Sequence, residues 1–127
     1  MKRRTFFQWL FGSLGAVAAS PVAVAGDRSV LIQESPVAGF QFHSGEAVWP
    51  SLIVGEPLEL RREPSNPYDA DAVAVYFKMR KLGYVPRAEN HVVARMLDRG
   101  ECLEATITQL SEGEDPWERI RFSISRV

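Results

Sequence analysis

Residue types that define several common protein classes are scarce in this chain of 127 residues. Cys102 is the only cysteine, so no disulfide can form within the chain. A four-ligand zinc site would have to combine Cys102 with His43, His91 and a distant carboxylate, and no local metal-binding spacing supports it. The glycine-rich loop of P-loop nucleotide hydrolases is also missing. The chain therefore has no ATPase of its own, and we predict neither a metal nor a cofactor.

Charges of both signs are present, but they are unevenly distributed. The chain has 15 basic and 16 acidic residues, and the first 25 positions contain three of the basic residues and none of the acidic ones. The remaining chain therefore carries 12 basic against 16 acidic residues, a net charge of −4. A mildly acidic body argues against strong, diffuse attraction to nucleic acid or anionic lipid, although it leaves room for a small basic patch.

The first 25 residues have the three-part layout of a secretory signal peptide. A basic start at residues 2–4 is followed by an apolar stretch over residues 6–19 and by the small residues of Ala23-Val24-Ala25. The apolar stretch is too short and too rich in Gly and Ser for a membrane-spanning helix. We therefore predict that residues 1–25 are a signal peptide cleaved after Ala25. The alternative is an N-terminal amphipathic or anchoring helix.

The start of this segment also resembles a twin-arginine export signal. Arg3-Arg4-Thr5-Phe6-Phe7 pairs two arginines with a nearby Phe and a following apolar residue, while Gln8 stands where that signal often has a basic residue. This resemblance implies that the protein folds before transport and is exported, in bacteria to the periplasm. Without a working signal the protein would remain in the cytoplasm.

The remainder of the chain shows the periodicity of short strands and one helix. No repeat, low-complexity tract or long linker divides it, so we expect one domain. Apolar residues at helical spacing, followed by Gly100, predict a helix over residues 88–99. Residues 49–53 are expected to form a turn of helix or a covering loop, and the acidic residues 112–116 a hairpin loop. Alternating apolar residues predict strands at 29–33, 37–42, 58–61, 73–77, 81–85, 103–107 and 120–124, where the second could instead continue the first. The expected fold is mainly β, a small twisted, barrel-like sheet of about six strands whose helix closes one end.

A stiff loop precedes the strand at residues 73–77, in the stretch REPSNPYDADAVAV at residues 62–75. Pro64 and Pro67 fix their own φ angles and disfavour helix before them, and Asp69 can form an Asx turn with the backbone just ahead of it. One interpretation needs no ligand: the loop is a corner, and the ring of Tyr68 plugs the end of the barrel. The other is a binding site, because a tyrosine on a rigid loop is a stacking platform and a carboxylate beside it can accept a hydrogen bond from a terminal hydroxyl.

The residues around this loop resemble the HIRAN domain family. The resemblance rests on Leu60–Asp69, Ala72–Val75 and Leu82–Arg87, with the upstream stretch Gly39–Gly45 similar to the family's first strand. It covers residues 37–127, preceded by a lead-in strand at 26–36. It implies a small OB-like β-barrel and a non-catalytic module that binds single-stranded DNA at a free 3′ end. Any hydrolase activity would then belong to a partner protein.

Carried over residue by residue, the resemblance implies a set of candidate ligand-binding residues. Tyr68 would stack on or brace the terminal nucleotide, and Asp69 would accept a hydrogen bond from its 3′ hydroxyl. The first-strand pair, Arg-Tyr in DNA-binding members, is Gln41-Phe42 here, so one phosphate-binding arginine is missing. The complete set is Gln41, Phe42, His43, Tyr68, Asp69, Tyr84 and Arg87. Because part of the positive charge is lost, we expect weaker and more salt-sensitive binding than in the DNA-binding members.

Two other functions are compatible with parts of the sequence. The export signal, the acidic body and the missing arginine suggest an exported module that uses the same barrel mouth for a peptide or a cell-envelope ligand. An exported enzyme using His43, Asp69 and His91 has the least support, because these residues show no recognised catalytic spacing.

Overall fold

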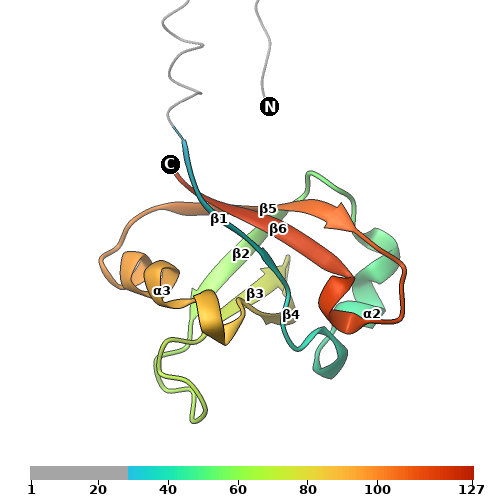
Figure 1. Ribbon diagram of the computed structural model, residues 1–127, viewed down its shortest axis with the longest axis horizontal. Helices are drawn as coiled ribbons and strands as arrows, with labels where there is room; N and C mark the ends of the chain where they lie inside the picture. Colours follow the sequence, from blue (N-terminus) through green and yellow to red (C-terminus); the bar gives the residue numbers. More distant parts are fainter. Residues whose placement is uncertain (1–28) are drawn as a thin grey trace, which may run out of the picture.

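The computed structural model describes residues 29–127, which form a six-stranded antiparallel sheet with short helices at its ends (Figure 1). The strands follow the order β1-β6-β5-β2-β3-β4. Their bounds are β1 Val30–Pro36, β2 Pro57–Arg62, β3 Val73–Phe77, β4 Arg80–Tyr84, β5 Leu103–Leu110 and β6 Ile120–Arg126. The helices are α2 Gly45–Val48 and α3 His91–Asp98, with the single turns η2 Phe40–Phe42, η3 Trp49–Ser51, η4 Arg87–Glu89 and η5 Pro116–Glu118. The mainly β, barrel-like fold predicted from the sequence is confirmed.

Alternating apolar residues build the core on the inner face of this curved sheet. Leu58, Val75 and Ile107 point inward from three strands, and each is less than a tenth exposed. α3 covers one end of the core with Val93 and Ala94, which are fully buried. Burial of this apolar surface is the main force that holds the strands together.

The two outer strands of the sheet approach each other at one end. The backbone of Ala38, two residues beyond β1, exchanges two hydrogen bonds with Tyr84 of β4, at N···O distances of 2.8 and 2.9 Å. A Cβ atom at Gly83 would overlap the carbonyl oxygen of Ala38, so this close approach requires glycine. The sheet is therefore open along most of its edge and joined at a single bridge, as a partly closed barrel.

The prediction of a strand over residues 37–42 was wrong. Extended structure stops at the Ala38 bridge, and Gly39 takes a left-handed conformation with φ of 75° that turns the chain into η2. The turn buries the Phe40 ring against Trp49, with centroids 6.0 Å apart, and leaves Phe42 exposed. Core burial of Phe40 thus outweighed the alternating pattern.

Other boundaries moved by a few residues. The helix predicted over residues 88–99 divides into η4 and the shorter α3, with the buried Asn90 between them. The expected turn after Trp49 is η3, and the acidic residues 112–116 lie in the β5–β6 hairpin loop, as predicted.

The predicted signal peptide, residues 1–25, lies outside the described residues. Among the helices that the structure does describe, none has both the length and the apolar character needed to cross a membrane.

Candidate functional site

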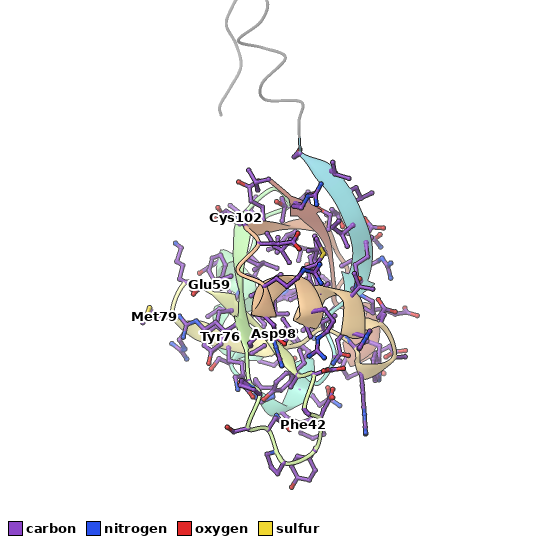
Figure 2. The ribbon with its side chains drawn as sticks, turned by 90° about the vertical axis from the view of Figure 1, so that its left-hand side faces the viewer. Phe42, Glu59, Tyr76, Met79, Asp98 and Cys102 are labelled. Carbon is purple, nitrogen blue, oxygen red and sulfur yellow. The ribbon has the colours of Figure 1, made fainter. Side chains whose placement is uncertain are left out.

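A groove of about 560 Å³ opens at the end of the sheet where the barrel bridge lies. It is bordered by η2, the β2–β3 loop, the end of β4, η4 and η5. Figure 2 shows Phe42 at the same end of the molecule as the long β2–β3 loop. Six of the seven candidate residues line this groove: Phe42, His43, Tyr68, Asp69, Tyr84 and Arg87. Gln41 is exposed on η2 but is not part of the lining.

Hydrogen bonds fix the course of the β2–β3 loop, residues 63–72. The side-chain oxygen of Asn66 accepts from the backbone N–H groups of Tyr68 and Asp69, at 2.8 and 3.2 Å. Its amide nitrogen donates to Glu63 at 3.1 Å. The loop is therefore held as two successive turns, and the position of its aromatic ring is set by the backbone rather than by burial.

Asp69 is both a structural and an accessible carboxylate. One of its oxygens accepts from the backbone N–H of Asp71 at 2.9 Å, which is the Asx turn expected from the sequence. The other accepts from the side-chain amide of Asn90 at 2.7 Å, which ties the loop to the start of α3. An ionised carboxylate has about four acceptor sites, so these two bonds leave each oxygen able to accept another.

Three aromatic rings from separate segments stand around the groove. The Tyr68 side chain is 83% exposed, Phe42 77% and Trp117 52%. The interpretation in which Tyr68 plugs the barrel is therefore wrong, because its ring projects outward. Large exposed rings that line one concavity are unusual unless something covers them.

A half-buried polar cluster supports the groove from the β4 side. The carboxylate of Glu63 accepts from Lys81 Nζ at 2.7 Å and from the hydroxyl of Tyr84 at 2.8 Å. Burial opposes the ionisation of Glu63, but hydrogen bonds from Lys81, Asn66 and Tyr84 outweigh it and lower its pKa. Burial likewise opposes the charge on Lys81, and its bonds to Glu63 and Tyr84 raise its pKa well above the usual value. The two groups are therefore a stable ion pair.

His43 packs edge-on against Tyr84, with ring centroids 5.6 Å apart. Burial, and then the nearby charge of Lys81, lower the pKa of His43 below its ordinary value. The imidazole is therefore neutral at pH 7 and contributes a polar ring rather than a charge.

Arg87 brings positive charge to the rim. It is exposed on η4, and no ion-pair partner for it occurs among residues 29–127. In contrast, Arg62 is engaged with Asp98 at 2.8 Å and with the carbonyl of Ala72 at 2.8 Å, and it joins the sheet to α3. Arg87 is thus available for an anion, whereas Arg62 is structural.

Sequence reasoning missed Trp117, which lines the groove but is absent from the set of candidate residues. Asp115 caps η5 by accepting from the backbone N–H of Trp117 at 3.0 Å, and this turn directs the indole to the groove. The Asp-Pro-Trp order in the sequence indicates such a capped turn. Whether the indole then faces the groove depends on the position of the β5–β6 hairpin in the sheet, which the local sequence does not give.

His43, Asp69 and His91 do not form a catalytic constellation. His91 lies outside the groove lining, and its Nδ1 is 3.0 Å from a carboxylate oxygen of Asp71. Within the described part of the chain, no group of three or more His, Cys, Asp or Glu residues could hold a metal ion.

Comparison with known proteins places the chain in a family. The sequence profile of the HIRAN domain matches residues 30–125. The chain belongs to the HIRAN domain family. A solved protein from Lactobacillus plantarum is similar at 28% identity with a TM-score of 0.68, over 77% of this chain and 94% of that one. The HIRAN domain of human HLTF is similar in fold, at 20% identity and a TM-score of 0.60, over 77% of this chain and 78% of that one. No curated protein sequence matches this HIRAN domain at a significant level.

Proposed function

We propose that this HIRAN protein is a non-catalytic module that binds a single nucleic-acid strand at its free 3′ end. Membership of a family of nucleic-acid-binding modules supports the general function. The observation that carries the finer proposal is the groove itself, where an exposed ring, a carboxylate with free acceptor sites and an unpaired arginine converge. Tyr68, Asp69 and Arg87 are the central residues.

The three groups would recognise different parts of a terminal nucleotide. Tyr68 and Phe42 offer stacking faces, and stacking on an aromatic side chain contributes about 1–3 kcal/mol per base. Asp69 can accept a hydrogen bond from the 3′ hydroxyl, and Arg87 can donate to the phosphate on its 5′ side. A strand that continued past the groove, or that ended in a 3′ phosphate, would bring negative charge against Asp69.

Binding is expected to be weak but less sensitive to salt than the sequence suggested, because the salt dependence of affinity follows the number of phosphate contacts. Arg87 supplies the accessible positive charge in the lining, and Gln41 stands where DNA-binding members of the family have an arginine. Fewer phosphate contacts mean that stacking contributes most of the affinity and that electrostatic attraction adds little at physiological salt.

Fluorescence anisotropy with 5′-labelled oligothymidylate would test this proposal. We expect a strand with a free 3′ hydroxyl to bind at least about tenfold more tightly at low salt than a strand with a 3′ phosphate. The phosphate loses affinity because its negative charge is placed against the carboxylate of Asp69. Tyr68→Ala should weaken binding to the free end by a similar factor, and Ile53→Ala, also exposed but in the loop between η3 and β2, should not. Equal affinity for the two ends would overturn end recognition.

A second candidate keeps the groove and changes the ligand. The predicted signal peptide and the net charge of −4 after residue 25 favour an exported, periplasmic protein, where a peptide or cell-envelope polymer is more abundant than single-stranded DNA. The lining of Phe42, Tyr68 and Trp117 with one arginine would also suit an apolar peptide with a carboxylate. A pull-down from envelope extract would test this candidate. A peptide or polymer that is retained by the wild-type protein but not by the Tyr68→Ala variant would favour it.

A further inference from the structure

The outward surface of three neighbouring strands begins at the rim of the groove. Tyr76 of β3 lies opposite Glu59 of β2 and Lys81 of β4, and Ala74 lies opposite Arg61 and Tyr84. Residues two apart on a strand share a face, so Arg61, Tyr76, Lys81 and Tyr84 form one surface, which we call the β2–β4 outer face. Figure 2 shows Glu59, Tyr76 and Met79 along one side of the molecule, with Phe42 at its groove end.

Planar and cationic side chains follow one another along this face. The Arg61 guanidinium lies over the Tyr76 ring, 3.9 Å from its centroid. Lys81 Nζ is 5.9 Å from the same centroid and 3.1 Å from the hydroxyl of Tyr84. Tyr84 in turn contacts His43, so the series continues without a gap into the groove lining. Alternating planar groups and cations are what single-strand-binding surfaces use for bases and phosphates.

The distribution of charge gives the groove two different sides. Residues 72–88, which include β3 and β4, contain four basic residues and no acid, and Lys78 and Arg80 are exposed at the hairpin tip. Residues 112–118, which surround Trp117 on the other side, contain four acids and no basic residue. Glu59 and Glu63 partly neutralise Arg61 and Lys81, so the hairpin tip carries the excess of positive charge. A polyanion that leaves the groove is therefore attracted to β3 and β4 and repelled by the β5–β6 loop.

We propose that the β2–β4 outer face is a second subsite, which holds the nucleotides on the 5′ side of the terminal one as the strand leaves the groove. This inference rests on the proposed function, because it takes the 3′ nucleotide to occupy the groove. Four steps along β4, from Tyr84 to Arg80, span about 13 Å. That length accommodates a few nucleotides, with Arg61 and Tyr76 beneath the bases and Arg80 and Lys78 beside the phosphates.

The length dependence of binding tests this subsite directly. A thymidine dinucleotide with a free 3′ hydroxyl fills the groove alone, whereas a decanucleotide also reaches the outer face. Affinities measured by calorimetry or NMR titration at low salt should favour the decanucleotide at least about fivefold. The slope of log affinity against log salt should be steeper for the longer strand by about 0.7 for each added phosphate contact.

Paired variants separate the subsite from the groove. The double variant Arg61→Ala, Arg80→Ala should remove the length advantage and leave dinucleotide affinity unchanged, because neither residue lines the groove. The matched control is Arg121→Ala, Arg126→Ala. Arg121 on β6 has the same 38% side-chain exposure as Arg61 and, like it, faces a glutamate. The control should retain the length advantage.

The outcomes distinguish this inference from the function on which it rests. If the dinucleotide binds in a Tyr68-dependent way but the decanucleotide binds no better, the second subsite is wrong and the groove function stands. A length advantage that survives in the Arg61→Ala, Arg80→Ala variant would place the extra contacts elsewhere and would also overturn the subsite. If neither strand binds, both the subsite and the proposed function fail.

Discussion

The β2–β3 loop and the β5–β6 loop, residues 111–119, both present an aromatic ring to the groove, but they are held in different ways. The first loop reaches outside itself: Asp69 bonds to Asn90 before α3, and Glu63 bonds to Tyr84 of β4. The second is closed by hydrogen bonds of its own, Ser111 to Arg119 at 2.9 Å and Asp115 to Trp117 at 3.0 Å, and is anchored outside only at its end, where Arg119 donates to Glu46 at 2.9 Å.

Because the two loops are held differently, we expect the rings of Tyr68 and Trp117 to have different roles in ligand binding. A ring whose loop is bonded to α3 and β4 keeps a fixed position relative to Asp69 and Arg87, so little entropy is lost when a ligand stacks on it. Trp117 stands on a single capped turn, two residues before the anchoring Arg119. We therefore propose Tyr68 as the fixed platform and Trp117, which is held by fewer bonds, as the more adaptable cover. The predictions below test this contrast, starting with the largest effect.

The largest effect on stability is expected at Gly83, beside the backbone bridge between Ala38 and Tyr84. In Gly83→Ala the added Cβ overlaps the Ala38 carbonyl oxygen and approaches Val37, which should lower the free energy of unfolding by about 2–3 kcal/mol. Chemical denaturation would measure this. The control is Gly113→Ala on the β5–β6 loop, where a Cβ meets nothing within 4 Å and stability should be unchanged. Equal stability of the two variants would show that the close approach is unimportant.

Loss of the central brace of the β2–β3 loop should come next. Asn66→Ala removes the acceptor for two backbone N–H groups and a donor to Glu63, at a cost of about 1–2 kcal/mol in stability. Binding of a free 3′ end should fall at least about tenfold, because the positions of Tyr68 and Asp69 are no longer fixed. Anisotropy titration would measure this loss. Wild-type affinity in the variant would contradict the platform role.

The pH dependence of stability should show the contribution of the Glu63–Lys81 ion pair. Its folded pKa is lowered, so its contribution is present above the ordinary value of 4.5 and is lost as pH falls through the folded pKa. The pKa of Lys81 is raised, so Lys81 stays charged throughout the acidic range and only Glu63 titrates there. Glu63→Gln should therefore be less stable than wild type by about 1–2 kcal/mol at pH 7, and this difference in stability should narrow as the pH falls below 4.5. A gap that stayed constant with pH would rule out the ion pair as its cause.

The smallest effect on stability and affinity is expected in the β5–β6 loop. Asp115→Ala removes the cap of one exposed turn, so it should cost about 0.5–1 kcal/mol or less in stability. Affinity for a free 3′ end should change less than about threefold, a difference of about 0.6 kcal/mol. A loss as large as that in Asn66→Ala would mean that Trp117 also needs a fixed position.

Much of the fold could be predicted because its strands follow simple alternation. β2, β3, β5 and β6 contain apolar residues at every second position that pack into one core, so local pattern and tertiary structure agree. The strand prediction at residues 37–42 failed because the Phe40 ring packs against Gly45 and Trp49, five and nine residues further along the chain, and strand alternation does not encode such contacts.

The site was predictable to a different extent for each residue. Resemblance to the family located Tyr68, Asp69 and Arg87, and turn chemistry explained the loop that carries two of them. Neither could indicate that Asp69 also bonds to Asn90, that Gln41 lies outside the lining, or that Trp117 belongs to it. These facts depend on how η2 and the β5–β6 hairpin meet in space.

The central claim is that a braced loop offers Tyr68 and Asp69 together to the 3′ end of a strand. Amide chemical shifts of labelled protein, titrated with a dinucleotide that carries a 3′ hydroxyl or a 3′ phosphate, test it most directly. We predict that the hydroxyl form shifts the amides of Asn66, Tyr68, Asp69 and Arg87, and that the phosphate form leaves them nearly unchanged. Equal shifts with both forms, or shifts confined to residues outside the groove, would contradict the account.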